Sequence, residues 1–443
     1  MPKLFNISIL KRTAMPKPTP DAPSSFEPAF LQLGFRPFFF LGAVYSLISL
    51  VIWGGFYAGQ IAPPAFLIDP ISWHIHEMLY GFTLAIIAGF LLTAVVNWTG
   101  SAPIRQRHLA ALCLLWLAGR IVINIDLGLS FWAILVIETS FIPVLLVSLA
   151  IPLIRANNRR NFLILLRLLV LFACDIWFLT SVSKIPLYIA LMMVLSMVSL
   201  IGGRVIPAFT VSALRRTGID VTQRPQPMLD RAAVASLIAV TACLIFAQGT
   251  VILTLCAGLS AIIHGTGMRH YHSLKTGSDP MLWILHIGYS WLVIGLTLLA
   301  LTGVGLLELP VIIHVLTAGC IGSMTLGMMV RVTLGHTGRP LESSSLTTLS
   351  FVLIQVAVLM RVLGPIFMPE QTTDWIIGSA ALWSFCFVIY LFLYAPMLFK
   401  PRADQPPHVI PTPSVPPTPS VIPTPTVIPA KAGTSARFPP TRE

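Results

Sequence analysis

Charged residues are scarce in this sequence. Asp, Glu, Lys and Arg make up only 10% of its 443 residues, whereas hydrophobic residues make up 56%. A water-soluble domain averages about 25% charged residues. The length alone would suggest two or three soluble domains, but the composition excludes a soluble globular protein.

Cysteine is also scarce, and its six copies are dispersed over six different apolar segments. No pair has the Cys-X-X-Cys spacing of a zinc or redox motif, so we interpret them as small buried hydrophobic residues. A cleavable signal peptide is missing as well. Lys11 and Arg12 interrupt the short apolar stretch near the N-terminus, and no small-residue cleavage site follows.

What the sequence does contain is apolar runs of about 20 residues, the length of a helix that crosses a bilayer. Twelve such runs predict an all-α, polytopic membrane protein. The expected spans are 37–59, 75–97, 107–124, 128–150, 161–180, 185–209, 230–247, 249–268, 281–302, 309–331, 345–366 and 375–398. They form one transmembrane domain at 37–398, between a proline-rich basic tail at 1–36 and a proline-rich tail at 399–443 that we expect to be disordered.

The distribution of Lys and Arg predicts the orientation in the membrane. Of the 28, 23 fall in the two tails or in loops on the same side, and only Lys184 falls in a loop on the opposite side. Because cytoplasmic loops retain basic residues, both termini are expected in the cytoplasm. The net charge of +12 is explained by this asymmetry and by contact with anionic lipid head groups, so no nucleic-acid partner is expected.

One segment of the chain resembles another. His76–Gly100 aligns with His314–Gly338 without a gap, and Arg120 matches Arg361 one helix later. We interpret this as parallel repeats in helices 1–4 and 9–12, with helices 5–8 as a diverged middle copy. Chance similarity among glycine-rich helices is the alternative.

The stretch WHIHEMLYGF (73–82) places ionisable residues at the start of an apolar helix. His76 and His314 would lie at one depth, about a turn inside the outer boundary. Two facing imidazoles can supply both axial ligands of one haem; the alternative is two interfacial histidines bonded to head groups or water. Arg120 and Arg361 lie near the same face, where they would bind haem propionates or snorkel to lipid phosphate.

Small residues support a haem between helices 2 and 10, because Gly81, Gly319 and Gly322 would leave room for a flat macrocycle. Other histidines are further candidates for metal binding. His74 points away from His76 on a regular helix and could act with Glu77. His264 and His286, toward the cytoplasm, are candidates for a metal or a proton path.

Two acidic residues lie deeper within expected helices. Glu138 and Asp175 need partners if they are buried as charges, and Arg167 is one candidate. Their role stays open at this point.

Several long motifs occur in the order typical of one family. They are GFRPFFFLG (34–42), WHIHEMLYGF (73–82), GFLLTAVVNWTG (89–100), GGRVIPAFT (202–210), LHIGYSWL (285–292) and HVLTAGCIGSMTLGMMVRVTLGHTGR (314–339). From about Phe35 to Pro396 the sequence resembles the NnrS family of bacterial membrane proteins. The resemblance implies a protein of the cytoplasmic membrane that contains haem (haem b) and copper and is associated with nitric oxide metabolism and tolerance. Nitric oxide or a related small molecule and an unidentified electron donor are the implied partners. If copper binds, we expect His74 with Glu77, or His264 with His286, because imidazole suits copper.

A weaker likeness concerns the fold. Twelve helices in three units of four are also the plan of subunit I of haem-copper oxidases and nitric oxide reductases. Helices 6 and 7 contain no histidine and helix 10 contains only one, so reduction at a dinuclear centre is unsupported.

The rival hypothesis is a secondary transporter with two repeats of six helices and a binding site on broken helices. The basic loop at 210–229 fits this plan, and Gly202, Gly203 and Pro207 could break helix 6. The repeat offset of 238 residues and the histidines near the two faces argue against it.

The topology is testable with reporter fusions. We expect fusions at residues 65 and 306 to report the non-cytoplasmic side and fusions at either end to report the cytoplasm. A cytoplasmic signal at residue 65 or 306 would contradict the orientation derived from the basic residues.

Overall fold

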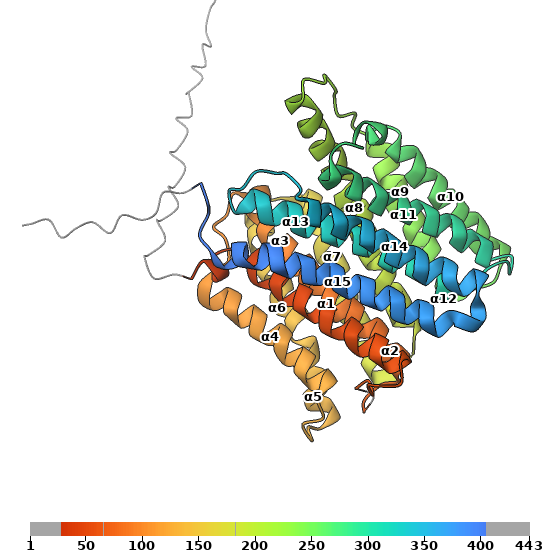
Figure 1. The fold of residues 1–443 in the computed structure, drawn as a ribbon. Helices are drawn as coiled ribbons and strands as arrows, with labels where there is room; N and C mark the ends of the chain where they lie inside the picture. The colour runs from red at the N-terminus through yellow and green to blue at the C-terminus, as the bar shows by residue number, and fades with distance from the viewer. Residues whose placement is uncertain (1–27, 65, 182, 405–443) are drawn as a thin grey trace, which may run out of the picture. The chain divides into compact units, whose positions relative to one another are not determined.

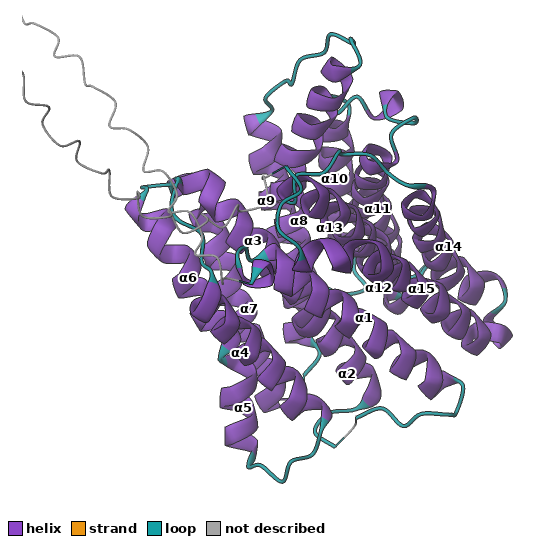
Figure 2. Cartoon of the chain, turned by 60° about the vertical axis from the view of Figure 1, so that its left-hand side comes forward, coloured by secondary structure: helices purple, strands orange, loops and turns teal. Residues whose placement is uncertain are grey.

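The computed structural model describes residues 28–64, 66–181 and 183–404. Every regular element in these ranges is helical (Figure 2). Across the described residues, twelve helices are long and apolar enough to cross a membrane. The predicted all-α class and number of spans are therefore confirmed, and the chain is a multi-pass membrane protein. Most of the two expected tails, residues 1–27 and 405–443, lies outside the described residues.

The first six spans are α1 (Phe35–Tyr57), α2–η2–α3 (Pro70–Thr99), α4 (Gln106–Asn124), α5–α6 (Phe131–Arg155), η3–α7 (Arg159–Ser181) and α8 (Ile185–Arg216). The other six are α9 (Pro227–Phe246), α10 (Val251–Met268), α11 (Pro280–Thr302), α12–η5–α13 (Leu309–His336), α14 (Ser345–Phe367) and η6–α15 (Pro369–Phe399). The sequence placed the spans correctly, but several helices continue beyond their apolar stretch.

The start of α2 (Pro70–His76) shows why helix ends differ from apolar boundaries. The Asp69 carboxylate accepts hydrogen bonds from the backbone nitrogens of Ile71 and Ser72, both at 3.1 Å, and Pro70 takes the first helical position. Such a cap begins a helix wherever it occurs, whether or not the next residues are apolar. Partial burial alone would raise the pKa of Asp69, but the hydrogen bonds from Ser72 and Ile71 outweigh it and hold the pKa below its usual range.

The first and last helices lie side by side (Figure 1). Arg36 at the start of α1 donates to the backbone carbonyls of Leu398 and Lys400, at 2.8 and 2.7 Å. The rings of Phe30 and Phe399 stack beside them, with centroids 4.3 Å apart. The two ends of the described bundle therefore lie together, as an even number of spans requires.

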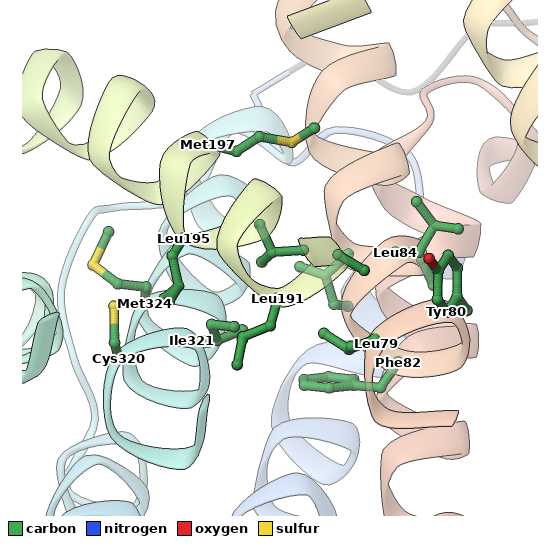
Figure 3. Close-up of a cluster of buried hydrophobic side chains, with 14 of the residues drawn as sticks. Leu79, Tyr80, Phe82, Leu84, Leu191, Leu195, Met197, Cys320, Ile321 and Met324 are labelled. Carbon is green, nitrogen blue, oxygen red and sulfur yellow. The ribbon is translucent and has the colours of Figure 1, made fainter. Parts of the chain in front are cut away.

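Spans 2, 6 and 10 form the centre of the bundle. Their most apolar windows are 78%, 61% and 61% buried, more than those of any other span found in the described residues. Figure 3 shows side chains of all three meeting: Leu79 and Phe82 of span 2, Leu191 and Leu195 of α8, and Ile321 of span 10. These would be the corresponding helices of three four-helix units, but the repeat itself stays a prediction.

Spans 2 and 10 share an unusual local geometry. After α2 the backbone becomes π-helical over Glu77–Thr83 (η2), and after α12 (Leu309–His314) it becomes π-helical over Val315–Gly322 (η5). Each π-helical segment begins directly after one of the histidines that the sequence alignment pairs, His76 and His314. Such segments insert an extra residue into a turn, which re-aims side chains, and they are frequent at functional sites.

Span 6 bears on the transporter hypothesis. The helix α8 runs without a break from Ile185 to Arg216, with Pro207 inside it. The discontinuity that a substrate site on broken helices would need is not present at this place in the described chain.

The hydrogen bonds between α1 and α15 should stabilise the folded protein. Arg36 is 1% exposed, so Arg36→Ala removes charged hydrogen bonds that water does not replace. Each is worth about 1.5–3 kcal/mol, and we expect the free energy of unfolding to fall by roughly 3 kcal/mol in detergent. Arg107→Ala removes an exposed arginine and serves as the control, with an expected change within about 0.5 kcal/mol. Equal effects of the two substitutions would contradict the role given to Arg36.

Candidate functional site

The polar residues at the start of span 2 contribute to two different sites. The side chains of His76 and Glu77 contact α4, α5 and α7, and Glu77 also accepts from Tyr45 of α1. The ring of His74 instead stacks on Trp53 of α1. Helical residues two positions apart point to nearly opposite sides, so His74 and His76 cannot serve the same centre here.

The first site is a buried ionic cluster, which we call the His76 cluster: His76, Glu77, Arg120, Glu138 and Asp175. The Nδ1 atom of His76 lies 2.7 Å from Glu77 Oε1, and its Nε2 atom lies 3.0 Å from Asp175 Oδ1 and 3.9 Å from Glu138 Oε1. All five side chains are at most 5% exposed. The cluster joins four spans in the interior of the bundle.

Arg120 holds the cluster together. One terminal nitrogen donates to Glu77 and the other to Glu138, which commits the guanidinium to two protein carboxylates. The Tyr45 hydroxyl also donates to Glu77, and Asn124 Nδ2 donates to the same carboxylate at 3.2 Å. Charge-assisted bonds of this kind are the strong ones in proteins, so Glu77 is fixed from three sides.

Packing fixes the imidazole of His76 as well. The rings of Tyr80 and Phe178 stack against it, with centroid distances of 5.0 and 5.4 Å. Tyr80 is anchored in turn, because its hydroxyl donates to the backbone carbonyl of Leu171 at 3.0 Å. His76 is therefore oriented by both its ring nitrogens and its faces.

A glycine makes room for one of the carboxylates. A Cβ atom at Gly119 would lie 2.5 Å from Oε2 of Glu138 and 3.3 Å from its Cδ. That Oε2 atom is buried and has no hydrogen-bond partner. The side chain of Glu138 thus occupies space that any larger residue at position 119 would take.

The second site, which we call the outer histidine pair, consists of His74 and His314 with Arg361. His74 stacks on the indole of Trp53 at a centroid distance of 4.2 Å and an angle of 8° between the planes. Its Nδ1 atom is buried without a hydrogen-bond partner. His74 and Arg361 both lie close enough to His314 to interact with it electrostatically, and Arg361 also reaches His74.

The tautomer of His314 follows from its neighbour. Its Nδ1 atom lies 2.7 Å from the backbone carbonyl of Pro310, one turn earlier. Because a carbonyl only accepts, Nδ1 carries the proton and the lone pair is on Nε2. Metal-binding histidines are commonly held in this way through the nitrogen that does not bind.

The structure places His74 within electrostatic range of His314, whereas the predicted haem pair was His76 with His314. Both ring nitrogens of His76 face carboxylates, and Arg120, predicted to meet a propionate, is bonded to Glu77 and Glu138. The predicted assignment stays a prediction, and these contacts favour His74 in place of His76. Arg361 lies within electrostatic range of both histidines, and its binding to a propionate stays a prediction.

Glycines that were expected to leave room for a macrocycle pack against aromatic rings. A Cβ atom at Gly81 would clash with the ring of Tyr45, and a Cβ atom would lie 2.9 Å from Trp291 at Gly319 and 2.6 Å from Trp383 at Gly322. Sequence reasoning identified the small residues but not which side chains fill the space beside them.

The predicted copper candidates do not form the expected pairs. His74 and Glu77 belong to the outer histidine pair and the His76 cluster respectively. His264 and His286 each have both ring nitrogens bonded to protein groups: Ser260 and Ser199 for the first, Thr210 and Ser273 for the second. These bonds account for both histidines without a metal, and the copper assignments stay predictions.

Sequence reasoning left Glu138 and Asp175 without a role and offered Arg167 as their partner. Arg167 instead donates to Ser196 Oγ at 2.6 Å and to the carbonyl of Leu163, and the partner of Glu138 is Arg120. The cluster could have been predicted from the balance of charges in the sequence. Three carboxylates and one arginine lie near the same end of spans 2 to 5, where each needs a partner.

Both sites lie within a segment that matches a known family. A family model described as NnrS protein matches residues 29–402. The chain belongs to the NnrS family. The family resemblance derived from the sequence motifs is therefore confirmed over most of the chain. A search of curated proteins gives no match.

The close contact at Gly119 is testable. Gly119→Ala forces the Glu138 carboxylate away from its position beside Arg120, and overpacking of this kind costs about 1–3 kcal/mol. Gly267→Ala is the matched control, because nothing lies within 4 Å of a Cβ added at this helical position, and alanine there should stabilise by up to about 1 kcal/mol. Thermal unfolding in detergent measures both, and a Gly119→Ala protein as stable as wild type would contradict the packing described.

Proposed function

We propose that the protein is a haem protein of the bacterial cytoplasmic membrane that acts in nitric oxide metabolism or tolerance, with His74 and His314 as the axial ligands. Membership of the NnrS family supports the cofactor and the process. The observation that carries the ligand assignment is the outer histidine pair: His314 is held through Nδ1 by Pro310, His74 is stacked on Trp53, and both histidines lie within electrostatic range of Arg361 on α14, which packs against α12.

The donor set of this pair fits a haem. His314 presents a free lone pair on Nε2, and His74 has a buried ring nitrogen without a partner. A buried polar atom without a partner is costly, and binding to a metal would remove that cost. Arg361 supplies a cation for a propionate. A haem held by two imidazoles supplies a low-spin iron suited to electron transfer.

The protein groups around the pair have defined tasks in this proposal. The Pro310 carbonyl holds His314 in the tautomer that leaves Nε2 free. Trp53 fixes the plane of the His74 ring by stacking. Rigid ligands reduce the cost of ordering the site when the cofactor enters.

A partly open apolar cavity lies between α3, α8 and span 10. Its lining includes Ile86, Met197 and Met324, and it is formed by apolar atoms. A small uncharged gas such as nitric oxide dissolves in a space of this kind, which supports nitric oxide as a partner. Copper and the electron donor rest on the family resemblance alone.

Absorption spectra of the purified protein test the proposal. We expect wild type to show a low-spin haem spectrum that His74→Gln and His314→Gln lose, because each removes an axial imidazole. His76→Gln should retain the spectrum, since that ring is held by Glu77 and Asp175. His336→Gln, on the same span as His314 but at its far end, is the matched control.

The outcomes separate the alternatives. Loss of the spectrum in His76→Gln with retention in His74→Gln would restore the pair predicted from the sequence. A wild-type protein without haem would contradict the proposal and strengthen the transporter hypothesis.

A further inference from the structure

The His76 cluster contains more negative than positive charge. Three carboxylates, those of Glu77, Glu138 and Asp175, face the single guanidinium of Arg120. With His76 neutral, two negative charges remain uncompensated. Ionised groups in the interior of a membrane protein are expensive unless they are paired, so the cluster needs two further positive charges.

Three of its members have the arrangement of metal ligands. One donor atom each from His76, Glu138 and Asp175 lies within 4.8 Å of the other two. Ligands about 2.1 Å from one ion lie roughly 3 to 4 Å apart. The separations from His76 Nε2, 3.0 Å to Asp175 and 3.9 Å to Glu138, fall in that interval.

The support around the donors is also that of a metal site. A histidine that binds a metal through Nε2 commonly donates from Nδ1 to a carboxylate, which orients the ring and makes it a better ligand. Glu77 Oε1 occupies this position, 2.7 Å from His76 Nδ1. Glu77 is itself fixed by Arg120, Tyr45 and Asn124.

An independent observation points to a ligand. Glu138 is 4% exposed, and its Oε2 atom is buried without a hydrogen-bond partner. Glu138 lines a small cavity together with Arg120, Asp175 and apolar and aromatic side chains, and this cavity has room for about one water molecule. The oxygen nearest His76 Nε2 is the other one, Oε1, which also accepts from Arg120. A buried carboxylate oxygen without a partner is costly, and a water molecule in this cavity, bound to a cation that Oε1 ligates, would satisfy Oε2.

The geometry points to a binding site for one divalent first-row metal ion. We propose that His76, Glu138 and Asp175 are its ligands and that Glu77 is a positioning residue. One imidazole with two carboxylates suits Zn²⁺, Mn²⁺ or Fe²⁺, and two positive charges neutralise the cluster. The site is separate from the outer histidine pair and does not depend on haem binding there.

Metal analysis of the full-length protein tests the proposal. The protein is purified in detergent with any affinity tag removed, dialysed against a chelator, equilibrated with Zn²⁺ or Mn²⁺ and passed through gel filtration. We expect wild type to retain one ion per chain, and Asp175→Asn and Glu138→Gln to retain almost none. His264→Gln changes a buried histidine outside the cluster and should retain the ion.

The positioning role of Glu77 is tested by a separate measurement. In the Mn²⁺ form, pulsed electron paramagnetic resonance should show one directly bound imidazole nitrogen. Glu77→Gln should keep that signal but weaken binding about 10- to 100-fold, as losses of such supporting carboxylates do. Loss of the nitrogen signal in Glu77→Gln would contradict a positioning role.

Folding controls keep the result interpretable. Asp175→Asn is nearly isosteric, and it should remain monodisperse, keep its helical circular dichroism and keep the wild-type haem spectrum. The proposal is overturned if wild type binds no more metal than Asp175→Asn, which would mean that protons balance the carboxylates. A bound ion without a nitrogen signal would also overturn it, and neither outcome affects the haem proposal.

Discussion

The arrangement of spans 2 to 5 depends on one constraint: a charge inside a membrane protein must be paired. Arg120 meets part of this need by donating to Glu77 and Glu138 from its two terminal nitrogens. Removing one member of such a set leaves the others buried and uncompensated, which costs several kcal/mol. The position of α5, and through Asp175 that of α7, is therefore tied to the orientation of His76.

The π-helical segments explain how two similar spans serve different chemistry. In span 2 the segment begins at Glu77 and turns the acidic side chain toward Arg120, whereas in span 10 the corresponding position is Val315 and carries no charge. One span thus supports an ionic cluster and the other a histidine with a free nitrogen. The π-helical geometry that spans 2 and 10 share agrees with the predicted repeat. The residues at equivalent positions, Glu77 and Val315, differ in charge, so the two copies would have diverged in chemistry.

The sequence predicted the fold well because bilayer thickness leaves few alternatives for runs of about 20 apolar residues. It predicted less of the site. Alignment paired His76 with His314 as equivalent positions, but equivalent positions in a repeat need not face each other. His74 has no counterpart in that alignment, so its proximity to His314 and Arg361 depends on tertiary packing. Glu138 and Asp175 were visible as acids within helices, but the partner of Glu138 is Arg120 and the partner of Asp175 is His76, and the sequence had suggested another role for both.

The bonds from Arg36 to the end of α15 have a consequence for biosynthesis. The carbonyls that Arg36 of α1 bonds lie at the end of α15, 362 and 364 residues later in the chain. At roughly 5–20 residues per second, the ribosome needs about 20 to 70 s to supply those carbonyls. During that interval α1 presents an arginine and a long helical face without their final neighbour. Truncation of the chain before α15 would make that exposure permanent, so quality control has a defined surface by which to recognise an unfinished copy.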